Sequence, residues 1–276
     1  MYYVIQENVF REKHYNMLIE TLERFELEHC VVRIFPFSDK VVKLSDIPEG
    51  SYNLEDLLHL DLARSDVFVF GAVKLARVAV GYDWAPGSLL NKNHDFKVYR
   101  EHYRENLLNW DSQVRKVIDL VEWKRDGTQG QLQFIRPVKD SKTFTGALFT
   151  ESEWDHEVVR MLNNDSSFTL DTEIQIASPK NIQKEIRCWV VGGKIITASQ
   201  YKLGSTTQYD SVVEPEALEF AQRMVDVFQL AEAFVIDVCL VGGEWKIVEC
   251  GCINCAGFYH SDVQRTISAL ETHFNR

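Results

Sequence analysis

The sequence contains no long apolar run, and no segment approaches the ~20 apolar residues that a membrane-spanning helix needs. Its N-terminal residues lack a basic segment followed by an apolar stretch, so we expect no secretory signal peptide. Positive charge is not in excess, because 30 Lys and Arg stand against 41 Asp and Glu, a net charge of −11. An acidic surface repels nucleic-acid phosphates and anionic lipid, which argues against non-specific nucleic-acid binding and against a membrane partner.

The six cysteines do not form the pattern of a disulfide framework. Several lie in apolar, strand-like runs, such as Cys188 and Cys239, which is typical of buried thiols in a reducing compartment. Cys250, Cys252 and Cys255 lie close together, but no fourth cysteine or well-spaced histidine completes a zinc or iron–sulfur site. The cysteines therefore favour a cytoplasmic protein without a thiolate metal centre.

The first part of the chain alternates between strand-like and helix-like segments, which predicts a small α/β unit with a parallel sheet. Strands are expected at residues 2–5, 30–35 and 66–70, and helices at residues 11–25, 54–63 and 73–80. A stretch rich in Pro, Gly and Asn follows at residues 82–95 and predicts a linker. We therefore place the first domain at residues 1–82.

From residue 115 onward the pattern changes to strands and hairpins. Strands are expected at residues 116–122, 132–135, 173–176, 186–191, 194–198, 234–241 and 245–248, and helices at 96–108, 154–162 and 215–228. Two Gly-Gly pairs, at residues 192–193 and 242–243, predict tight hairpin turns. This part of the chain is therefore expected to be α+β.

The segment FIRPVKDSKTFTG, residues 134–146, is a candidate phosphate-binding loop. An apolar strand ends at Arg136, and Lys139 and Lys142 follow among small hydroxyl residues and Gly146. A flexible loop with backbone donors, hydroxyls and cations suits a polyphosphate. A solvated surface loop would explain the same residues, so the segment alone leaves both interpretations open.

The segment NIQKEIRCWVV, residues 181–191, reads as a strand with two different faces. Because alternate residues of a strand share a face, Glu185 and Arg187 point to one side, and Ile186 and Cys188 point to the other. One face belongs to the core, and the other carries a carboxylate beside a guanidinium. This second face is either an exposed ion pair or an arginine that binds phosphate oxygens.

The segment FVIDVCLVGGEWKIVECGCINCAGFY, residues 234–259, places carboxylates in apolar surroundings. Asp237 lies inside one apolar strand, Glu249 ends a second, and Asn254 follows in the next loop. Charges in such positions are costly unless they are paired or bound to metal. Oxygens of Asp, Glu and Asn are the ligands that Mg²⁺ prefers. The segment therefore predicts either a magnesium site or buried carboxylates with cationic partners.

Hairpin geometry limits the magnesium interpretation, since Asp237 and Glu249 can share a metal only if their side chains lie on one face. A strict two-residue turn at residues 242–243 would pair Asp237 with Val248 and send Glu249 to the other face. We therefore predict a loop of odd length, for example three residues with a glycine bulge.

Taken in order, these segments resemble the ATP-grasp superfamily, in particular a divergent bacterial and phage clade with a predicted role in peptide or protein modification. The resemblance covers most of the chain and includes ENLLNWD (residues 105–111) and KEIRCWVVGGKIITASQYK (residues 184–202). It implies an N-terminal α/β pre-ATP-grasp domain at residues 1–82. It also implies two α+β lobes, at residues 83–173 and 174–276, that enclose the nucleotide.

The resemblance also implies roles for individual residues. Cations at the nucleotide phosphates would be Arg136, Lys139 and Lys142, and the residues that assist catalysis would be Arg187, Lys142 and Arg136. Backbone groups of the inter-lobe hinge would read adenine at Gln175, Ile176, Ala177 and Ser178. Glu185 and Arg187 would form a pair on the phosphate side. Ligands to Mg²⁺ or Mn²⁺ would be Asp237, Glu249 and Asn254, although the superfamily often has Asn two residues after the glutamate, where this chain has Gly251.

The function that the resemblance implies is ATP-dependent ligation of a carboxylate to an amine. The carboxylate would be activated as an acyl phosphate, with ADP and phosphate as products, and the substrate would be a peptide, a protein or an amino-acid-like molecule. A kinase on the same fold and a non-catalytic ATP-binding assembly factor are the alternatives. Fold alone does not decide among them.

Overall fold

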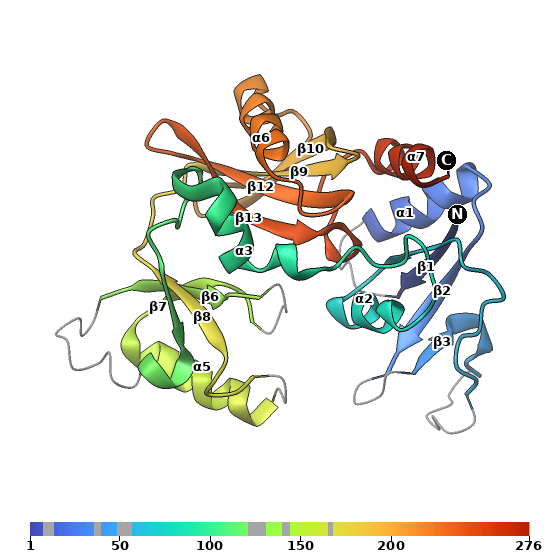
Figure 1. The fold of residues 1–276 in the computed structure, drawn as a ribbon, viewed down its shortest axis with the longest axis horizontal. Helices are drawn as coiled ribbons and strands as arrows, with labels where there is room; N and C mark the ends of the chain where they lie inside the picture. Colours follow the sequence, from blue (N-terminus) through green and yellow to red (C-terminus); the bar gives the residue numbers. More distant parts are fainter. Residues whose placement is uncertain are drawn as a thin grey trace.

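The computed structural model describes residues 1–7, 14–35, 40–48, 57–120, 131–139, 144–164 and 168–275 of the chain. Within these ranges the chain forms three β-sheets with helices packed against them (Figure 1), and we use the element labels of that figure. Of the helices in the described ranges, none combines the length and the apolar character that a membrane span requires.

The N-terminal sheet has the strand order β3-β2-β1-β4. The central strand β1 runs parallel to β2 and β4, and β3 is an antiparallel edge strand. Its elements are β1 (Tyr2–Gln6), α1 (His14–Arg24), β2 (His29–Ile34), β3 (Val41–Lys43), η1 (Leu44–Asp46), β4 (Val67–Phe70) and α2 (Val73–Val80). β1 and β4 are almost entirely apolar and buried, as expected for parallel strands that are covered on both faces. The predicted α/β unit is confirmed.

The helix expected at residues 54–63 is wrong where the structure describes it, from residue 57. This segment is extended beside the sheet, and the backbone N–H of Leu60 donates to the carbonyl of Val41, at 2.7 Å. Leu57 and Leu60 are both buried. Their spacing of three suggests a helix in the sequence, but an extended chain buries the same two side chains.

The second sheet is antiparallel, with the order β5-β8-β6-β7. Its elements and the segments that lead to it are η2 (Lys92–His94), α3 (Phe96–Tyr103), η3 (Arg104–Asn106), β5 (Gln113–Lys116), η4 (Val117–Asp119), β6 (Gln133–Pro137), β7 (Ala147–Phe149), α5 (Glu151–Asn164) and β8 (Glu173–Ala177). Ile135, Trp154 and Ile174 meet in the core between this sheet and α5. Because β8 pairs with β5 and β6, the first lobe ends after Ala177 and not at the predicted residue 173.

The strand expected at residues 116–122 is also corrected. Lys116 ends β5, and a 3-10 helix begins at Val117, while residues 121–122 lie outside the described ranges. The carboxylate of Asp119 accepts a hydrogen bond from the backbone N–H of Lys116, at 3.2 Å. This local contact favours the turn over a longer strand.

The third sheet is antiparallel, with the order β11-β10-β9-β12-β13. Its elements and flanking helices are β9 (Lys184–Val191), β10 (Lys194–Leu203), β11 (Thr206–Asp210), α6 (Pro215–Val227), β12 (Ala233–Val241), β13 (Glu244–Cys252), η5 (Ile253–Cys255) and α7 (Val263–Phe274). Figure 1 shows α6 above the sheet and α7 beside the N-terminal helix α1. Both chain ends therefore lie on the same side of the molecule.

The alternation along β9 explains how the third sheet serves two cores. Ile186, Cys188 and Val190 pack in the cluster that includes α3 and α6. Trp189 and Val191 face the other way, into the cluster shared with α7 and the N-terminal sheet. The face that carries Trp189 continues along the strand to Arg187 and Glu185, as the sequence predicted. These two side chains line a cleft instead of a core.

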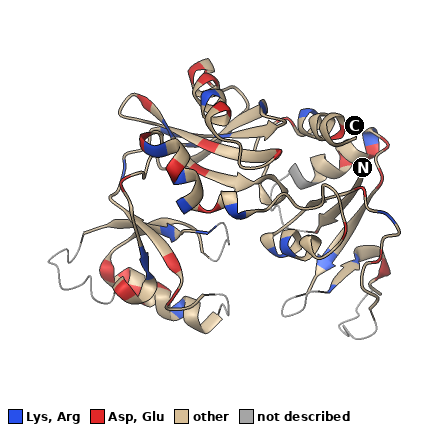
Figure 2. Ribbon diagram, viewed as in Figure 1, with Lys and Arg blue, Asp and Glu red and all other residues tan. Residues whose placement is uncertain are grey.

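Acidic and basic residues are interspersed over all three parts of the ribbon in Figure 2. Acidic residues gather on α5, on the side of the second lobe away from the third sheet. Cations that converge in the cleft therefore differ from the general acidic character of the chain.

Candidate active site

A cleft of about 1000 Å³ lies between the second and third sheets. Its walls come from β6 and β7 on one side, from β9, β10 and β13 on the other, and from the segment that joins β8 to β9. Its polar lining includes Asn109, Arg136, Lys139, Thr145, Ser178, Lys180, Asn181, Glu185, Arg187, Tyr201, Lys202, Glu249 and Tyr259. This volume is at the upper end of the roughly 300–1,000 Å³ that small-molecule sites occupy.

Three neighbouring strands place Arg187, Asp237 and Glu249 in one row. In the ladders, Arg187 of β9 is paired with Asp237 of β12, and Asp237 is paired with Glu249 of β13. Directly opposite residues share a sheet face, so the three side chains lie on the same side of the sheet. This is the side that opens into the cleft.

The hairpin between β12 and β13 reaches this register by a different route from the one predicted. Val241 pairs with Glu244 across a two-residue Gly242-Gly243 turn, so the predicted loop of odd length is wrong. Both glycines have positive φ, as this tight turn requires. The ladder instead shifts between Asp237 and Val238, where Val248 is an extra residue on β13. This bulge restores the parity and turns Glu249 to the face of Asp237.

Arg187 and Asp237 form a buried, two-pronged ion pair. Nε and Nη2 of Arg187 donate to the two carboxylate oxygens of Asp237, each at 2.8 Å. The Asp237 side chain is 2% exposed and that of Arg187 is 9% exposed. Burial lowers the pKa of Arg187, but the charge and hydrogen bonds of Asp237 outweigh burial and leave this pKa well above its ordinary value. The guanidinium is therefore a fixed positive charge at the wall of the cleft.

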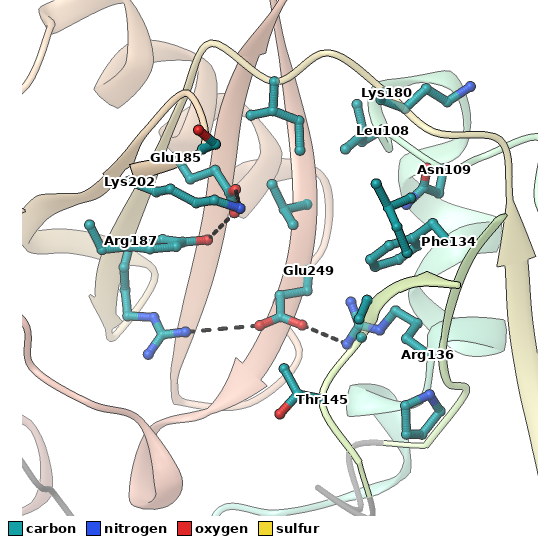
Figure 3. A pocket seen from close by; sticks show the side chains of 18 of the residues that line it. Leu108, Asn109, Phe134, Arg136, Thr145, Lys180, Glu185, Arg187, Lys202 and Glu249 are labelled. Atoms are coloured by element: carbon teal, nitrogen blue, oxygen red, sulfur yellow. Dashed lines mark hydrogen bonds and ion pairs between the residues drawn. The ribbon is translucent and has the colours of Figure 1, made fainter. Parts of the chain in front are cut away.

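Glu249 joins the two lobes across the cleft. Its Oε2 lies 2.6 Å from Nη2 of Arg136, which is on β6 of the first lobe. Its Oε1 lies 3.9 Å from Nη2 of Arg187. Figure 3 shows the carboxylate of Glu249 between the two guanidinium groups. Two cations from different sheets thus converge on a single point in the cleft.

The position of Arg136 depends on the alternation of β6 and on a glycine. Ile135 points into the core under α5, so Phe134 and Arg136 point to the cleft. A Cβ atom at Gly146 would lie 2.9 Å from Cβ of Arg136 and 2.9 Å from the ring of Phe134. The close approach of these chains therefore requires glycine at position 146.

A second ion pair lies beside the first on the cleft wall. Nζ of Lys202, from β10, is 2.9 Å from Oε1 of Glu185, and the hydroxyl of Tyr201 donates to Oε2 at 2.6 Å. Burial and the nearby carboxylates of Asp237 and Glu185 raise the pKa of Tyr201 well above its ordinary value, so the phenol remains protonated. Glu185 is thus held by partners on the neighbouring strand.

Tyr259 packs against Arg187 from the segment that follows η5. The guanidinium carbon of Arg187 lies 4.8 Å from the ring centroid of Tyr259 and 5.8 Å from that of Tyr201. The two tyrosine rings are stacked on each other, with centroids 4.9 Å apart. Nη1 of Arg187 also donates to the carbonyl of Gly257, at 3.3 Å. The guanidinium is therefore fixed at its edges and over its plane.

The predicted hinge residues divide into two groups. β8 has a partner strand on each side through Ile176, so the backbone groups of Gln175 and Ile176 serve the sheet. The Gln175 side chain is buried and donates to Ser112 Oγ, at 3.0 Å. Ala177 still pairs with β6. Only Ser178 of this set lines the cleft, followed by Lys180, Asn181 and Ile182. The connection between the lobes therefore begins after Ala177, because β8 is a central strand.

Asn254 is not part of the cleft cluster. Its Oδ1 accepts from the backbone N–H of Leu89 at 2.8 Å, and its Nδ2 donates to the carbonyls of Val69 and Gly87, at 2.7 and 3.2 Å. Its side chain is fully buried. These contacts tie the end of β13 to the N-terminal domain, and they place Asn254 apart from Asp237 and Glu249 in the structure.

The candidate phosphate loop is described only in part. Lys139 lines the cleft, as do Thr145 and Gly146. Lys142, together with Ser141 and Thr143, lies outside the described residues. Its role as a phosphate contact stays a prediction.

The expected metal ligands fit a divalent cation only through Glu249. Asp237 does not line the cleft and both of its oxygens face Arg187, while the Asn254 amide binds backbone groups. In the part of the chain that the structure describes, no group of three or more His, Cys, Asp or Glu side chains is placed to hold a metal. Mg²⁺ often uses one or two carboxylates together with substrate phosphates. Glu249 therefore fits as a protein ligand to a metal that arrives with a nucleotide.

Several cleft residues were not predicted as site residues. Lys202 and Tyr201 meet Glu185 only because β10 is irregular between Gln200 and Lys202. A regular two-residue hairpin at Gly192-Gly193 would place Gln200 opposite Glu185. Tyr259 comes from a non-repetitive segment, so no strand or helix pattern indicates its direction. Asn109 lies in the segment ENLLNWD, whose place in the cleft depends on how the lobes pack.

The geometry agrees with the comparison of the sequence with known families. A family model described as an ATP-grasp domain, clade family 3, matches residues 80–270. The chain therefore belongs to this ATP-grasp family, whose superfamily contains ATP-dependent ligases that use Mg²⁺. No curated protein matches the chain.

Solved structures show the same fold across almost the whole chain. The D-alanine–D-alanine ligase of Coxiella burnetii is 12% identical, with 99% of this chain and 95% of that chain covered and a TM-score of 0.61. The ATP-grasp ligase PsnB in complex with a minimal precursor is 11% identical, with 99% and 98% covered and a TM-score of 0.57. The D-cycloserine synthetase DcsG is 12% identical, with 99% of both chains covered and a TM-score of 0.57. At these identities the likeness shows the fold alone, and it confirms the predicted ATP-grasp fold.

Proposed function

We propose that the chain is an ATP-dependent carboxylate–amine ligase that acts through an acyl phosphate, and that the cleft between its lobes is the active site. The observation that carries the proposal is the row Arg187–Asp237–Glu249, which meets Arg136 of the opposite lobe inside a cleft of about 1000 Å³. Cations for phosphate beside a carboxylate for a divalent metal are the groups that phosphoryl transfer requires.

The reaction has two steps. A substrate carboxylate oxygen attacks the γ-phosphorus, a new carbon–oxygen–phosphorus link forms, and the bond between the γ-phosphorus and the β–γ bridging oxygen breaks to release ADP. The amine nitrogen then attacks the acyl carbon, and phosphate leaves as the amide bond forms and the amine loses a proton. Both steps spread negative charge over oxygens near the γ-phosphate position.

The cleft cations would offset this charge. Arg187 is held rigidly by Asp237, so little reorganisation is needed when charge develops beside it. Arg136 and Lys139 would bind phosphate oxygens from the first lobe, together with Lys142. Glu249 would hold Mg²⁺ or Mn²⁺ with the nucleotide phosphates, and the bound ion would offset their charge. The apolar residues Leu108, Phe134, Ile182 and Val248 in the lining give a surface on which a base can stack.

The substrate class is the least constrained part of the proposal. PsnB, one of the similar structures, has been solved with a precursor peptide and AMPPNP and with a minimal precursor, Mg and ADP. We propose by analogy that a peptide or protein supplies the carboxylate or the amine here. The cleft volume of about 1000 Å³ is at the upper end for a small-molecule site, which leaves room for a peptide end beside a nucleotide.

The test is release of ADP and phosphate with mixed amino acids and peptides as substrates. Ligase activity predicts free phosphate in equal amount to a ligated product. Phosphate retained on the substrate would indicate a kinase, and tight ATP binding without turnover would indicate an assembly factor. Arg187→Ala is expected to lower turnover roughly 10²–10³-fold, the usual cost of one preorganised charge-stabilising donor. Arg187→Lys is expected to restore little, because an ammonium cannot reproduce the planar fork. Turnover like the wild type in Arg187→Ala and in Glu249→Gln would contradict this site.

A further inference from the structure

We infer that Asp237 and Tyr259 are positioning residues that hold Arg187 in one orientation toward the transferred phosphate, and that Asp237 is not a metal ligand. The inference rests on the proposed function only in assigning a phosphate to the space beside Arg187. It concerns the two residues that contact Arg187 most closely, one of which the sequence assigned to metal and the other to no role.

The place of Asp237 in the sheet supports a role behind Arg187. Asp237 lies on β12 between Arg187 and Glu249, one on each neighbouring strand. Its side chain is 2% exposed and it does not line the cleft. A metal that also binds nucleotide phosphates must lie in the cleft, where Glu249 reaches and Asp237 does not. Both Asp237 oxygens are instead 2.8 Å from guanidinium nitrogens of Arg187.

The backbone of Tyr259 supports a positioning role independently. Tyr259 has φ of 53°, in the left-handed region that non-glycine residues rarely adopt. Such conformations persist where the surrounding structure requires them, and they are common at functional sites. Here the conformation brings the ring to 4.8 Å from the guanidinium carbon of Arg187, at the wall of the cleft. A cation over an aromatic face is stabilised by the charge distribution of the ring.

Together these contacts leave one side of the guanidinium for a ligand. Nε and Nη2 bind Asp237, and Nη1 binds the carbonyl of Gly257. Nη2 also faces Glu249 across 3.9 Å on the cleft side. An arginine with five donors in a rigid plane keeps N–H groups for a phosphate at this edge. Fixing the plane in advance reduces the ordering that phosphate binding requires.

The test separates phosphate binding from metal binding, with AMPPNP and Mn²⁺ as the probes. Asp237→Asn is expected to weaken AMPPNP binding in EDTA by about ten-fold, the effect of one charge-assisted contact, and to leave the Mn²⁺ affinity of the AMPPNP complex within about two-fold. Glu249→Gln is expected to show the reverse for Mn²⁺, with a loss of at least about ten-fold. An equal loss of Mn²⁺ affinity in Asp237→Asn would restore Asp237 as a metal ligand and overturn the inference.

Tyr259 provides variants that keep the buried ion pair, in case Asp237→Asn does not fold. Tyr259→Leu is expected to weaken AMPPNP binding in EDTA about three- to ten-fold, because the aromatic face is lost. Tyr259→Phe keeps the ring and the same backbone strain, so wild-type affinity is expected. Glu271→Gln is the matched control, since this carboxylate binds the Tyr3 hydroxyl at 2.7 Å outside the cleft. Equal effects in the Leu and Phe variants, or in Glu271→Gln, would contradict the role of the ring.

A nucleotide-free measurement tests the inference even if the proposed function fails. In nitrogen-resolved NMR, the Nε–H of Arg187 is expected to exchange slowly with solvent in the wild type, with or without Mg²⁺, and faster in Tyr259→Leu. Release of this proton by Mg²⁺, with or without AMPPNP, would show that Asp237 leaves Arg187 for the metal, and would refute the inference. Absence of AMPPNP binding by the wild type would instead refute the nucleotide site, while the exchange rates would still decide the positioning role.

Discussion

The ion pair between Arg136 and Glu249 predicts that nucleotide and metal bind in a coupled way. Each partner is required elsewhere in the proposed complex, Arg136 by a phosphate and Glu249 by the metal. In the structure the two side chains are bound to each other, Nη2 to Oε2 at 2.6 Å. A metal-free nucleotide must therefore break this pair, and it leaves Glu249 beside the phosphate charge. A nucleotide that carries its metal gives each residue a new partner.

The size of the effect follows from the burial of the pair. The side chains are 16% and 26% exposed, so the pair is neither fully buried nor a surface pair. Exposed pairs contribute ~0–1 kcal/mol. Hydrogen bonds to charged groups contribute ~1.5–3 kcal/mol. We take about 1–2 kcal/mol for this pair, between those limits, which corresponds to roughly 5–30-fold in affinity.

The perturbation is Glu249→Gln, which keeps the shape of the side chain and removes its charge. AMPPNP is expected to bind this variant roughly 5–30-fold more tightly than the wild type in EDTA, because Arg136 is released at lower cost. In Mg²⁺ the order is expected to reverse, since the variant lacks the metal ligand. Titration calorimetry in both conditions measures the two affinities. Weaker AMPPNP binding by Glu249→Gln in EDTA would refute the reasoning, because Glu249 would then assist nucleotide binding without metal.

Three further predictions concern other parts of the molecule. Asn254→Ala is expected to destabilise the chain by about 2–4 kcal/mol, because Leu89 N–H and the carbonyls of Val69 and Gly87 lose their partner, and to leave Mn²⁺ affinity unchanged; urea unfolding and Mn²⁺ titration measure both, and a selective loss of Mn²⁺ would return Asn254 to the metal site. Cys255 lines the cleft, so AMPPNP is expected to slow its alkylation by iodoacetamide, followed by mass spectrometry; equal labelling with and without AMPPNP would place the nucleotide elsewhere. Burial raises the pKa of Cys239 to about 12, so in the same experiment at pH 8 this thiol is expected to remain unlabelled until the chain unfolds, and rapid labelling of the native chain would contradict its burial.

Much of the local structure could be predicted from the sequence. The alternation in residues 186–191 predicted that Arg187 and Glu185 lie opposite Ile186 and Cys188, and the structure agrees. The Gly-Gly pairs predicted both tight turns of the third sheet. These features depend on neighbours within a few residues, where strand periodicity and the positive φ of glycine decide the conformation.

The sequence did not determine the partners of the charged side chains. Its interpretation left Asp237 between a metal and a cationic partner. The cation is Arg187, which lies fifty positions away in the chain and becomes adjacent only because β12 pairs with β9. The bulge at Val248 is likewise invisible in a run of apolar residues, because its energy depends on what both faces of the sheet bury.

The sequence by itself determined which residues carry charge in apolar strands, which strands alternate and where the chain turns, because each of these follows from short-range sterics and the burial of apolar side chains. Only the tertiary structure decided that Arg136 of one lobe meets Glu249 of the other, that β8 belongs to the first lobe, and that Asn254 binds the N-terminal domain. Electrostatic and hydrogen-bond partners are chosen by distance in space. Strand order, a one-residue bulge and the packing of two lobes set that distance, and all three depend on contacts between residues that are far apart in the chain.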